Sequence, residues 1–274
     1  MVALDFDSLL VGACGDSIAT RTGRKCDIFR NGMHQETELS VSGGSPTLNY
    51  YASGNLMDAQ GAEPRNNKRT YSGRLNVGFA PSDRFRVATN VGYVTGPTHL
   101  PCEAGCGGYV WTTLFATPNN YNNESRHGFH SWLPYQYDKL VQIWQDLERT
   151  TASVRFEHQP RTWLSHRMII GGDRTREGNN WLQPRMDSLQ YQAGSGALGY
   201  RAITARTVTN KSLDYTASGI WNYGSDFRFT TSVGTQYYHE TVHSVYAEGS
   251  VFPAAGLTSV SSTTQSRFNS EGFV

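Results

Sequence analysis

The chain has 274 residues, a formal net charge of +1 and only 17% charged residues, below the roughly 25% that is usual in soluble domains. The near-neutral charge argues against a polybasic nucleic-acid binder, and no apolar run is long enough for a membrane-spanning helix. The 28 glycines and the 12% aromatic content favour many short strands joined by turns.

The N-terminal residues do not form a usable secretory signal peptide. Asp5 and Asp7 stand where a secretory signal peptide needs basic residues, and the apolar stretch that follows them is too short. We therefore expect export to depend on another segment, or the chain to be an incomplete piece of a longer protein.

From residue 39 onward, apolar and polar residues alternate, which is typical of strands with one apolar face. Ala80-Pro-Ser-Asp83 lies between two such strands and has turn chemistry, with proline in the second position. The same strand–turn–strand unit recurs three more times. The predicted strands are 39–43 and 48–57, 70–79 and 85–93, 152–157 and 164–170, and 213–222 and 227–237. The sequence thus predicts an all-β, antiparallel meander of about eight strands in four hairpins.

The connections alternate in length along the chain. Short turns lie inside the predicted hairpins, at 44–47, 80–83, 159–162 and 223–226. Longer segments join the hairpins, at 58–68, 96–148, 174–208 and 249–274. An outer-membrane β-barrel alternates in this way because its periplasmic turns are short and its outer loops are long. We therefore expect the meander to be part of an outer-membrane barrel.

The two faces of the predicted strands also differ. The polar face carries five arginines at Arg74, Arg86, Arg155, Arg167 and Arg228. They fit a wet barrel lumen, and they would equally fit the solvated outer face of a soluble sandwich. Aromatic residues gather near the short turns, as in a barrel's aromatic girdle, at Phe79, Phe85, Trp163, Trp221 and Phe227. Candidates for a second girdle at the far strand ends are Tyr93, Tyr237 and Tyr238.

The longest predicted loop holds the residues with the most distinctive chemistry. Cys102 and Cys106 could close a small disulfide loop in an oxidising compartment, and the alternative is two free thiols. His127 and His130 lack the glutamate and the helical setting of a zinc motif, so we expect no metal site. Residues 134–148 have apolar positions near helical spacing and predict a short helix.

Nothing in the sequence indicates catalysis, because nucleophile-elbow, phosphate-loop and dinucleotide fingerprints are all missing. We expect neither enzymatic activity nor a cofactor. Loop aromatics could stack on sugars, although any single one packs more often inside its own loop: Tyr109, Trp111, Tyr121, Trp132, Tyr135 and Trp181. The alternative to a barrel is therefore a soluble all-β carbohydrate-binding module.

Several motifs resemble the barrel strands of SusC/RagA-like TonB-dependent outer-membrane transporters. The most specific stretch runs from Ser40-Val-Ser-Gly-Gly-Ser45 to Tyr71-Ser-Gly-Arg-Leu-Asn76, and Trp163-Leu-Ser-His166 and Gly171-Gly-Asp173 are similar to later strands. The resemblance covers about residues 26–260, and it implies that 26–274 is part of the barrel and that 1–25 is a divergent N-terminal segment. It implies a barrel of about 22 strands that is closed by a plug domain and sits in outer-membrane lipid.

The resemblance further implies import of a large nutrient, such as an oligosaccharide or a peptide, with no enzymatic step and no nucleic-acid partner. The expected partners of the intact transporter are the TonB complex and a surface lipoprotein of the SusD type. The sequence departs from the family pattern because it shows neither the plug nor the TonB-contacting segment. We therefore expect this chain to be a partial barrel of the bacterial outer membrane.

Overall fold

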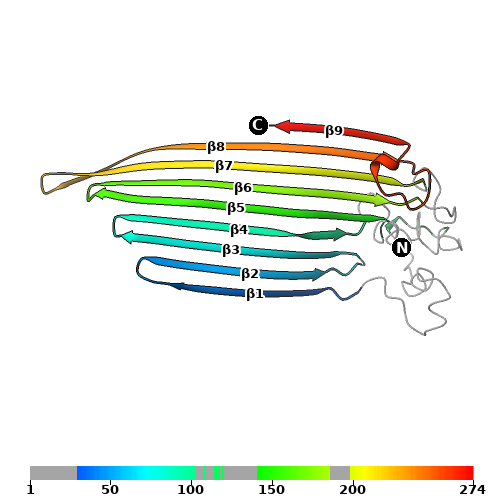
Figure 1. The fold of residues 1–274 in the computed structure, drawn as a ribbon, viewed down its shortest axis with the longest axis horizontal. Helices are drawn as coiled ribbons and strands as arrows, with labels where there is room; N and C mark the ends of the chain where they lie inside the picture. The colour runs from blue at the N-terminus through cyan, green and yellow to red at the C-terminus, as the bar shows by residue number, and fades with distance from the viewer. Residues whose placement is uncertain are drawn as a thin grey trace.

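The computed structural model describes residues 30–63, 65–102, 108, 114, 115, 117, 119, 141–185 and 198–273. These residues form one sheet of nine strands in sequence order, and every neighbouring pair is antiparallel (Figure 1). The strands are β1 (Met33–Gly44), β2 (Leu48–Gln60), β3 (Asn67–Ser82), β4 (Phe85–Leu100), β5 (Gln142–Arg161), β6 (Leu164–Gln183), β7 (Tyr200–Tyr223), β8 (Phe227–Ser250) and β9 (Gln265–Phe273). A 3-10 helix, η3 (Val260–Ser262), precedes β9. The predicted all-β meander is confirmed.

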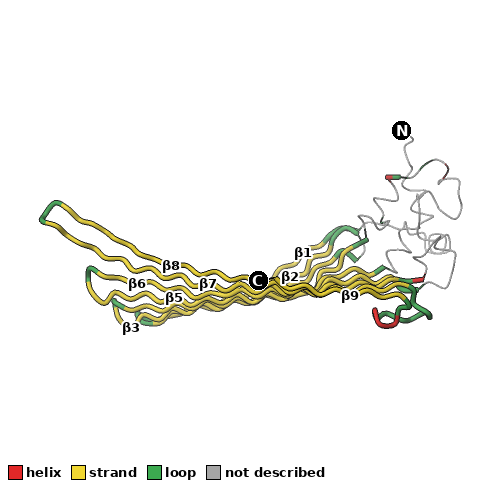
Figure 2. Tube along the Cα trace, turned by 90° about the horizontal axis from the view of Figure 1, so that it is seen from above, coloured by secondary structure: helices red, strands yellow, loops and turns green. Residues whose placement is uncertain are grey.

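The two ends of the sheet differ in their connections. All four tight turns lie at one end, and the longer connections lie at the other end (Figure 1). Seen from above, the described strands form a single twisted layer (Figure 2). In the described part of the chain, no helix is long and apolar enough to cross a membrane.

The strands reach further toward the long connections than the sequence pattern predicts. β5 begins at Gln142 and β6 ends at Gln183, while β7 begins at Tyr200 and β8 ends at Ser250. Residues 142–148 are therefore extended, and the helix predicted over 134–148 is wrong there. A ninth strand, β9, lies inside the predicted loop 249–274. In this part of the sheet both faces carry polar side chains, so the alternation that marks a strand in the sequence is lost.

The register places residues of opposite character on opposite faces. Since paired residues share a face and successive residues alternate, the pairs Leu75↔Ala52 and Leu75↔Val91 define an apolar face. Arg74 and Asn76 lie on the other face, which we call the polar face. The exposed large apolar residues of β1 to β8 belong to the apolar face with few exceptions, such as Leu100 and Tyr238.

The short turns lie on a slope relative to the hydrogen-bonded rows. One row of paired residues crosses β2 to β8 through Leu48, Phe79, Val87, Phe156, Met168, Tyr215 and Thr235. Leu48 is the first residue of β2. Six strands away, on β8, the same row passes through Thr235, which lies eight residues after Phe227, the first residue of β8. The left edge of Figure 1 is accordingly stepped.

This stagger fixes the tilt of the strands. Eight residues over six strand steps is about 1.3 residues per strand, or about 4.4 Å of sliding for each 4.8 Å of strand spacing. The strands therefore run at about 40° to the perpendicular of the line that joins the short turns. Closed barrels require strand tilts of about 35–45°, so the register has the geometry of a barrel wall.

The buried apolar residues lie almost entirely near the long connections, where Cys102 and Val141 pack with Ile143 and Trp181. Phe252 and Val260 are also buried, beyond the end of β8. By contrast, the apolar face is open: Leu75 in the middle of β3 is 45% exposed. No second sheet covers it among the described residues, so they do not form the sandwich of the alternative interpretation.

Gly96 marks an irregular point in β4. Its φ is +153°. The next residue, Pro97, has no N–H to donate to the neighbouring strand. A Cβ at Gly96 would overlap the carbonyl oxygen of Arg69 on β3. Glycine is therefore required for the close approach of the two backbones.

Candidate functional site

The polar face holds the candidate site, and all five sequence-predicted arginines lie on it. Arg86 pairs across the sheet with Glu157, and Glu157 pairs with Arg167. Arg155 lies 3.9 Å from Glu157. Three arginines and one glutamate thus occupy neighbouring positions, which leaves an excess of positive charge in this part of the face.

A groove of about 490 Å³ lies beside this cluster, near the short turns. Its lining includes Arg86, Glu157 and Arg167, together with Ser165 and Thr216. Arg86 and Arg167 form no ion pair within the described part of the chain. Guanidinium groups without protein partners can bind carboxylates or phosphates in bidentate fashion, so the groove favours anionic or strongly polar groups.

A larger groove of about 920 Å³ lies on the same face over β1 to β5. Glu36 and Glu38 line one side and Arg74 and Arg149 line another, so the groove carries both charges. Asn55 donates to Glu36 at 2.6 Å, which holds that carboxylate in place. The arrangement suits a ligand with both donors and acceptors.

Arg149 and Asp173 form an ordered pair at the same level of the polar face. The Arg149 Nε lies 2.7 Å from the Asp173 carboxylate, and the Thr151 hydroxyl donates to the same oxygen at 2.6 Å. Arg149 was not among the predicted site residues because it lies just outside the predicted strand 152–157. Thr151, which donates to the same Asp173 oxygen, also lies outside that strand, so no alternation indicated this pair.

Two tyrosines and a glutamate form a second polar cluster near the long connections. The Tyr246 hydroxyl donates to Glu248 at 2.6 Å and the Tyr200 hydroxyl at 2.9 Å. The hydrogen bond from Tyr246, followed by that from Tyr200, lowers the pKa of the Glu248 carboxyl. Burial, followed by the hydrogen bonds to Tyr246 and Glu248, raises the pKa of the Tyr200 phenol. Because Tyr200 lay in the predicted loop 174–208, no sequence pattern indicated this cluster.

Of the aromatic residues predicted to bind sugars, only Trp181 lies within the described part. Tyr109, Trp111, Tyr121, Trp132 and Tyr135 lie outside it. Trp181 sits on the polar face of β6, where it packs against the small core and meets Tyr200 edge-on at 6.2 Å. It is thus a packed residue and not an open stacking platform.

Cys102 is disulfide-bonded, and its predicted partner Cys106 lies outside the described residues. No group of three or more potential metal ligands occurs among the residues that the structure describes.

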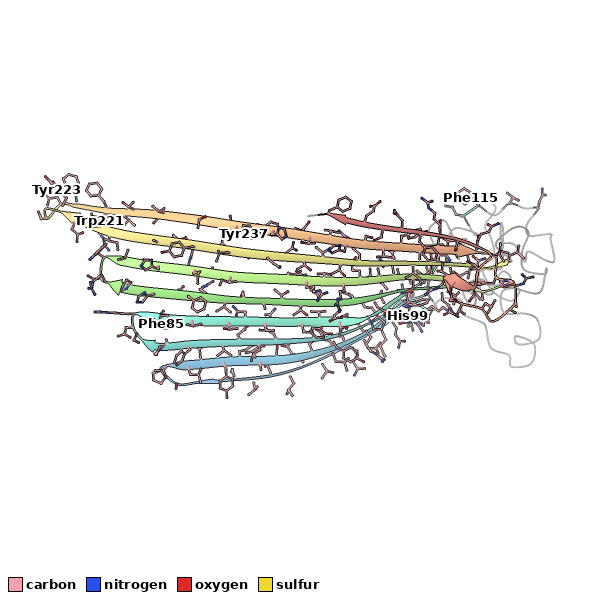
Figure 3. The ribbon with its side chains drawn as sticks, turned by 45° about the horizontal axis from the view of Figure 1, so that its top comes forward. Phe85, His99, Phe115, Trp221, Tyr223 and Tyr237 are labelled. Carbon is pink, nitrogen blue, oxygen red and sulfur yellow. The ribbon has the colours of Figure 1, made fainter. Side chains whose placement is uncertain are left out.

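Aromatic residues bound the apolar face at both ends. Near the short turns, the rings of Trp163 and Trp221 lie 5.0 Å apart, and Phe227 and Phe229 stack nearby at 6.3 Å. Figure 3 shows Trp221 and Tyr223 at this end of the sheet, with Tyr237 part-way along β8 and His99 near the long connections.

Tyrosines mark the other boundary at Tyr71, Tyr93 and Tyr237. Each lies eight residues from an aromatic residue near the turns, at Phe79, Phe85 and Phe229 respectively. The predicted role of Tyr238 in this boundary is wrong, because Tyr238 lies on the polar face and its hydroxyl donates to Asn210 at 2.8 Å. Tyr238 and Tyr237 are adjacent in the strand, so their side chains point to opposite faces.

The tyrosine boundary follows the same slope as the short turns. The row from Tyr71 on β3 reaches His243 on β8, which stands six residues beyond Tyr237 after five strand steps. This offset of about 1.2 residues per strand matches the stagger of the turns. The apolar face therefore has a band of constant height.

No protein-family model matches the sequence, and no curated protein matches it. Among solved structures, the chain is similar over 99% of its length to the RagAB peptide importer in its open-open state, with a TM-score of 0.72 and 18% identity. The closed-closed state of that importer matches 90% of the chain with a TM-score of 0.70 and 19% identity. The ferric citrate transporter FecA, in its unliganded form, matches 88% of the chain with a TM-score of 0.54 and 16% identity.

The matched region covers 33%, 29% and 31% of those three chains respectively. At these identities the similarity concerns the fold, and at that level the resemblance stated from the sequence is confirmed. The chain shares the barrel fold of these transporters, and it spans about a third of their length.

Proposed function

We propose that the sheet forms part of the wall of a TonB-dependent outer-membrane barrel that imports a large polar nutrient, such as a peptide or an oligosaccharide, without enzymatic chemistry. The apolar face meets lipid and the polar face lines the lumen. The observation that carries this proposal is the exposed apolar band of constant height, bounded by aromatic residues at both ends.

The height of the band agrees with a bilayer. Eight to ten residues separate Tyr237 from Phe229 and Phe227 on β8. At about 3.3 Å per residue and a tilt of about 40°, this separation spans roughly 20–25 Å along the membrane normal, close to the 25 Å band of outer-membrane barrels. In water an exposed band of this size would promote aggregation, whereas lipid covers it.

The polar face supplies the ligand-facing surface of the proposed lumen. Arg74, Arg86, Arg155, Arg167 and Arg228 would contact carboxylate or hydroxyl groups of a ligand that passes along the two grooves. The similarity to a peptide importer supports a peptide as one class of ligand. The intact transporter would draw energy from the TonB complex and bind a surface lipoprotein of the SusD type, and the loop aromatics other than Trp181 would meet the ligand first.

Spin labels at neighbouring positions on opposite faces test this placement. We choose Leu75 and Val154 on the apolar face, and Asn76 and Ser153, one residue along, on the polar face. Labels are attached through an encoded keto amino acid so that native cysteines do not react, and the full chain is reconstituted in vesicles. Apolar-face labels should relax more with oxygen, which concentrates in lipid, and polar-face labels with a water-soluble nickel chelate.

Two kinds of result would contradict the membrane placement or change its interpretation. Equal access of the nickel chelate to both faces, or a chain that stays in solution without lipid or detergent, would overturn the membrane placement. Nickel access limited to the polar face, together with loss of oxygen contrast on the apolar face, would instead indicate a protein cover over the band.

A further inference from the structure

The apolar face carries a small group of basic side chains just beyond the tyrosine boundary. On β7, Lys211 lies two residues from Leu213 on the same face, toward the long connections. On β8, His239 lies two residues from Tyr237 in the same direction. Arg174 occupies the corresponding position on β6, beyond Gly172. These three residues come from adjacent strands and face outward, away from the proposed lumen.

The three side chains are close neighbours. Lys211 and His239 are directly paired across β7 and β8. Arg174 pairs with Thr209, two residues from Lys211, so that Arg174 and Lys211 are diagonal neighbours at about 7–8 Å. The offset follows the stagger of the sheet, which keeps all three at nearly the same depth in the proposed membrane.

Charge is sorted between the two faces of β6, β7 and β8. Every carboxylate on these strands lies on the polar face, at Asp173, Glu177, Asp214, Glu240 and Glu248. The outward face carries cations and no carboxylate. The nearest acid on that face is Glu148 of β5, which lies 3.7 Å from Arg176, one position farther out than Arg174.

Arg174 and Lys211 have no ion-pair partner within the described part of the chain. His239 stacks beside Tyr237, with ring centroids 6.3 Å apart, and its Nε2 lies 3.2 Å from the Thr241 hydroxyl. The corresponding outward positions at the short-turn end hold Phe85, His158, His166, Trp221 and Phe227, and Arg161, which pairs with Leu164, is the one arginine among the described strand residues there. Three basic side chains on adjacent strands therefore mark the long-connection boundary, whereas the short-turn boundary is mainly aromatic.

We propose that Arg174, Lys211 and His239 bind the phosphate of an anionic lipid headgroup in the leaflet at the long-connection end. The inference rests on the membrane placement proposed above. The guanidinium of Arg174 offers a planar pair of donors and the ammonium of Lys211 a point charge, while His239 supplies a ring nitrogen beside them. Basic groups at this depth attract anionic headgroups.

Lipid retention by the full chain tests the site. The chain is reconstituted in phosphatidylcholine vesicles with a minor fraction of lipid A, extracted in mild detergent and analysed for bound lipid A by native mass spectrometry. The double variant Arg174→Gln/Lys211→Gln should retain less lipid A than the unaltered chain, by about fivefold for each charge removed. The conservative variant Arg174→Lys/Lys211→Arg should retain most of it.

A matched control removes two basic residues from the opposite face, outside the two grooves. The variant Lys68→Gln/Arg206→Gln should retain lipid A as the unaltered chain does. Should the glutamine variant at Arg174 and Lys211 fail to incorporate, the unaltered chain is tested with increasing salt and with inorganic phosphate. Both should release lipid A if a phosphate is held by charge, and no release would count against the site.

The outcomes separate this inference from the proposed function. A chain that does not enter neutral phosphatidylcholine vesicles contradicts the membrane placement itself. A chain that enters them, yet retains equal lipid A with and without the two charges, or shows no enrichment of lipid A at all, overturns the headgroup site and leaves the membrane placement intact.

Discussion

An arginine placed at the centre of the apolar band should be costly, whereas one placed on the adjacent polar-face residue should not. Leu75 lies four residues from Tyr71 and four from Phe79, so it sits at mid-band. Arginine at the midplane of an outer-membrane barrel costs about 2–4 kcal/mol, and near the interface about 0–1 kcal/mol. Leu75→Arg should therefore lower the free energy of unfolding by about 2–4 kcal/mol.

Two matched variants make this prediction specific. Thr95→Arg, just beyond Tyr93 on the same face, should cost about 0–1 kcal/mol, and Asn76→Arg on the polar face should change stability by less than about 0.5 kcal/mol. Guanidinium unfolding of the chain in vesicles measures all three. In a sheet that faces water on both sides the three costs would be similar, and that result would refute the reasoning.

Four further predictions concern single features. A double-mutant cycle of Trp163→Ala and Trp221→Ala should give a coupling of about 0.5–1.5 kcal/mol from their ring contact, and zero coupling would contradict it. Gly96→Ala should destabilise by more than about 1 kcal/mol, whereas Gly92→Ala, with open space around it, should cost less in the same unfolding assay. Because hydrogen bonds lower the pKa of Glu248 in the folded state, its stabilisation is present above the ordinary value of 4.5 and is lost as pH falls through the lower folded-state value. The difference in free energy of unfolding between the unaltered chain and Glu248→Gln should therefore shrink as the pH is lowered. A difference independent of pH would contradict the lowered pKa of Glu248. Peptide mapping without reductant should join Cys102 to Cys106, and a different partner would correct that pairing.

The sequence predicted those parts of the fold in which the two faces meet different surroundings. Alternation placed Arg74, Arg86, Arg155, Arg167 and Arg228 on one face because each lies within the band or near its edge, beside apolar neighbours. The turn signals at Pro81 and at Gly224 located hairpins for the same local reason. Pairing of strands in order then followed from the short turns.

Prediction failed beyond the tyrosine boundary, where alternation has no physical cause. There Asp58 pairs with Arg69 and Glu148 with Arg176 on the face that is apolar lower down, so both faces are polar. Strand β9 lies wholly in this region, and its Phe268 and Phe273 even point to opposite faces. The clusters around Arg149 and Glu248 depend on register between distant strands, which no local pattern reports.

The strands continue well past the tyrosine boundary, and their length sets how far from the membrane an external molecule would bind. β8 runs thirteen residues from Tyr237 to Ser250. With the membrane placement proposed above, at about 3.3 Å per residue and a tilt of about 40°, its end would stand about 30 Å above the lipid. The sheet would then rise above the membrane by about the thickness of the hydrocarbon core of a bilayer. A nutrient, an antibody or a partner that docks at its rim would do so well clear of the membrane surface.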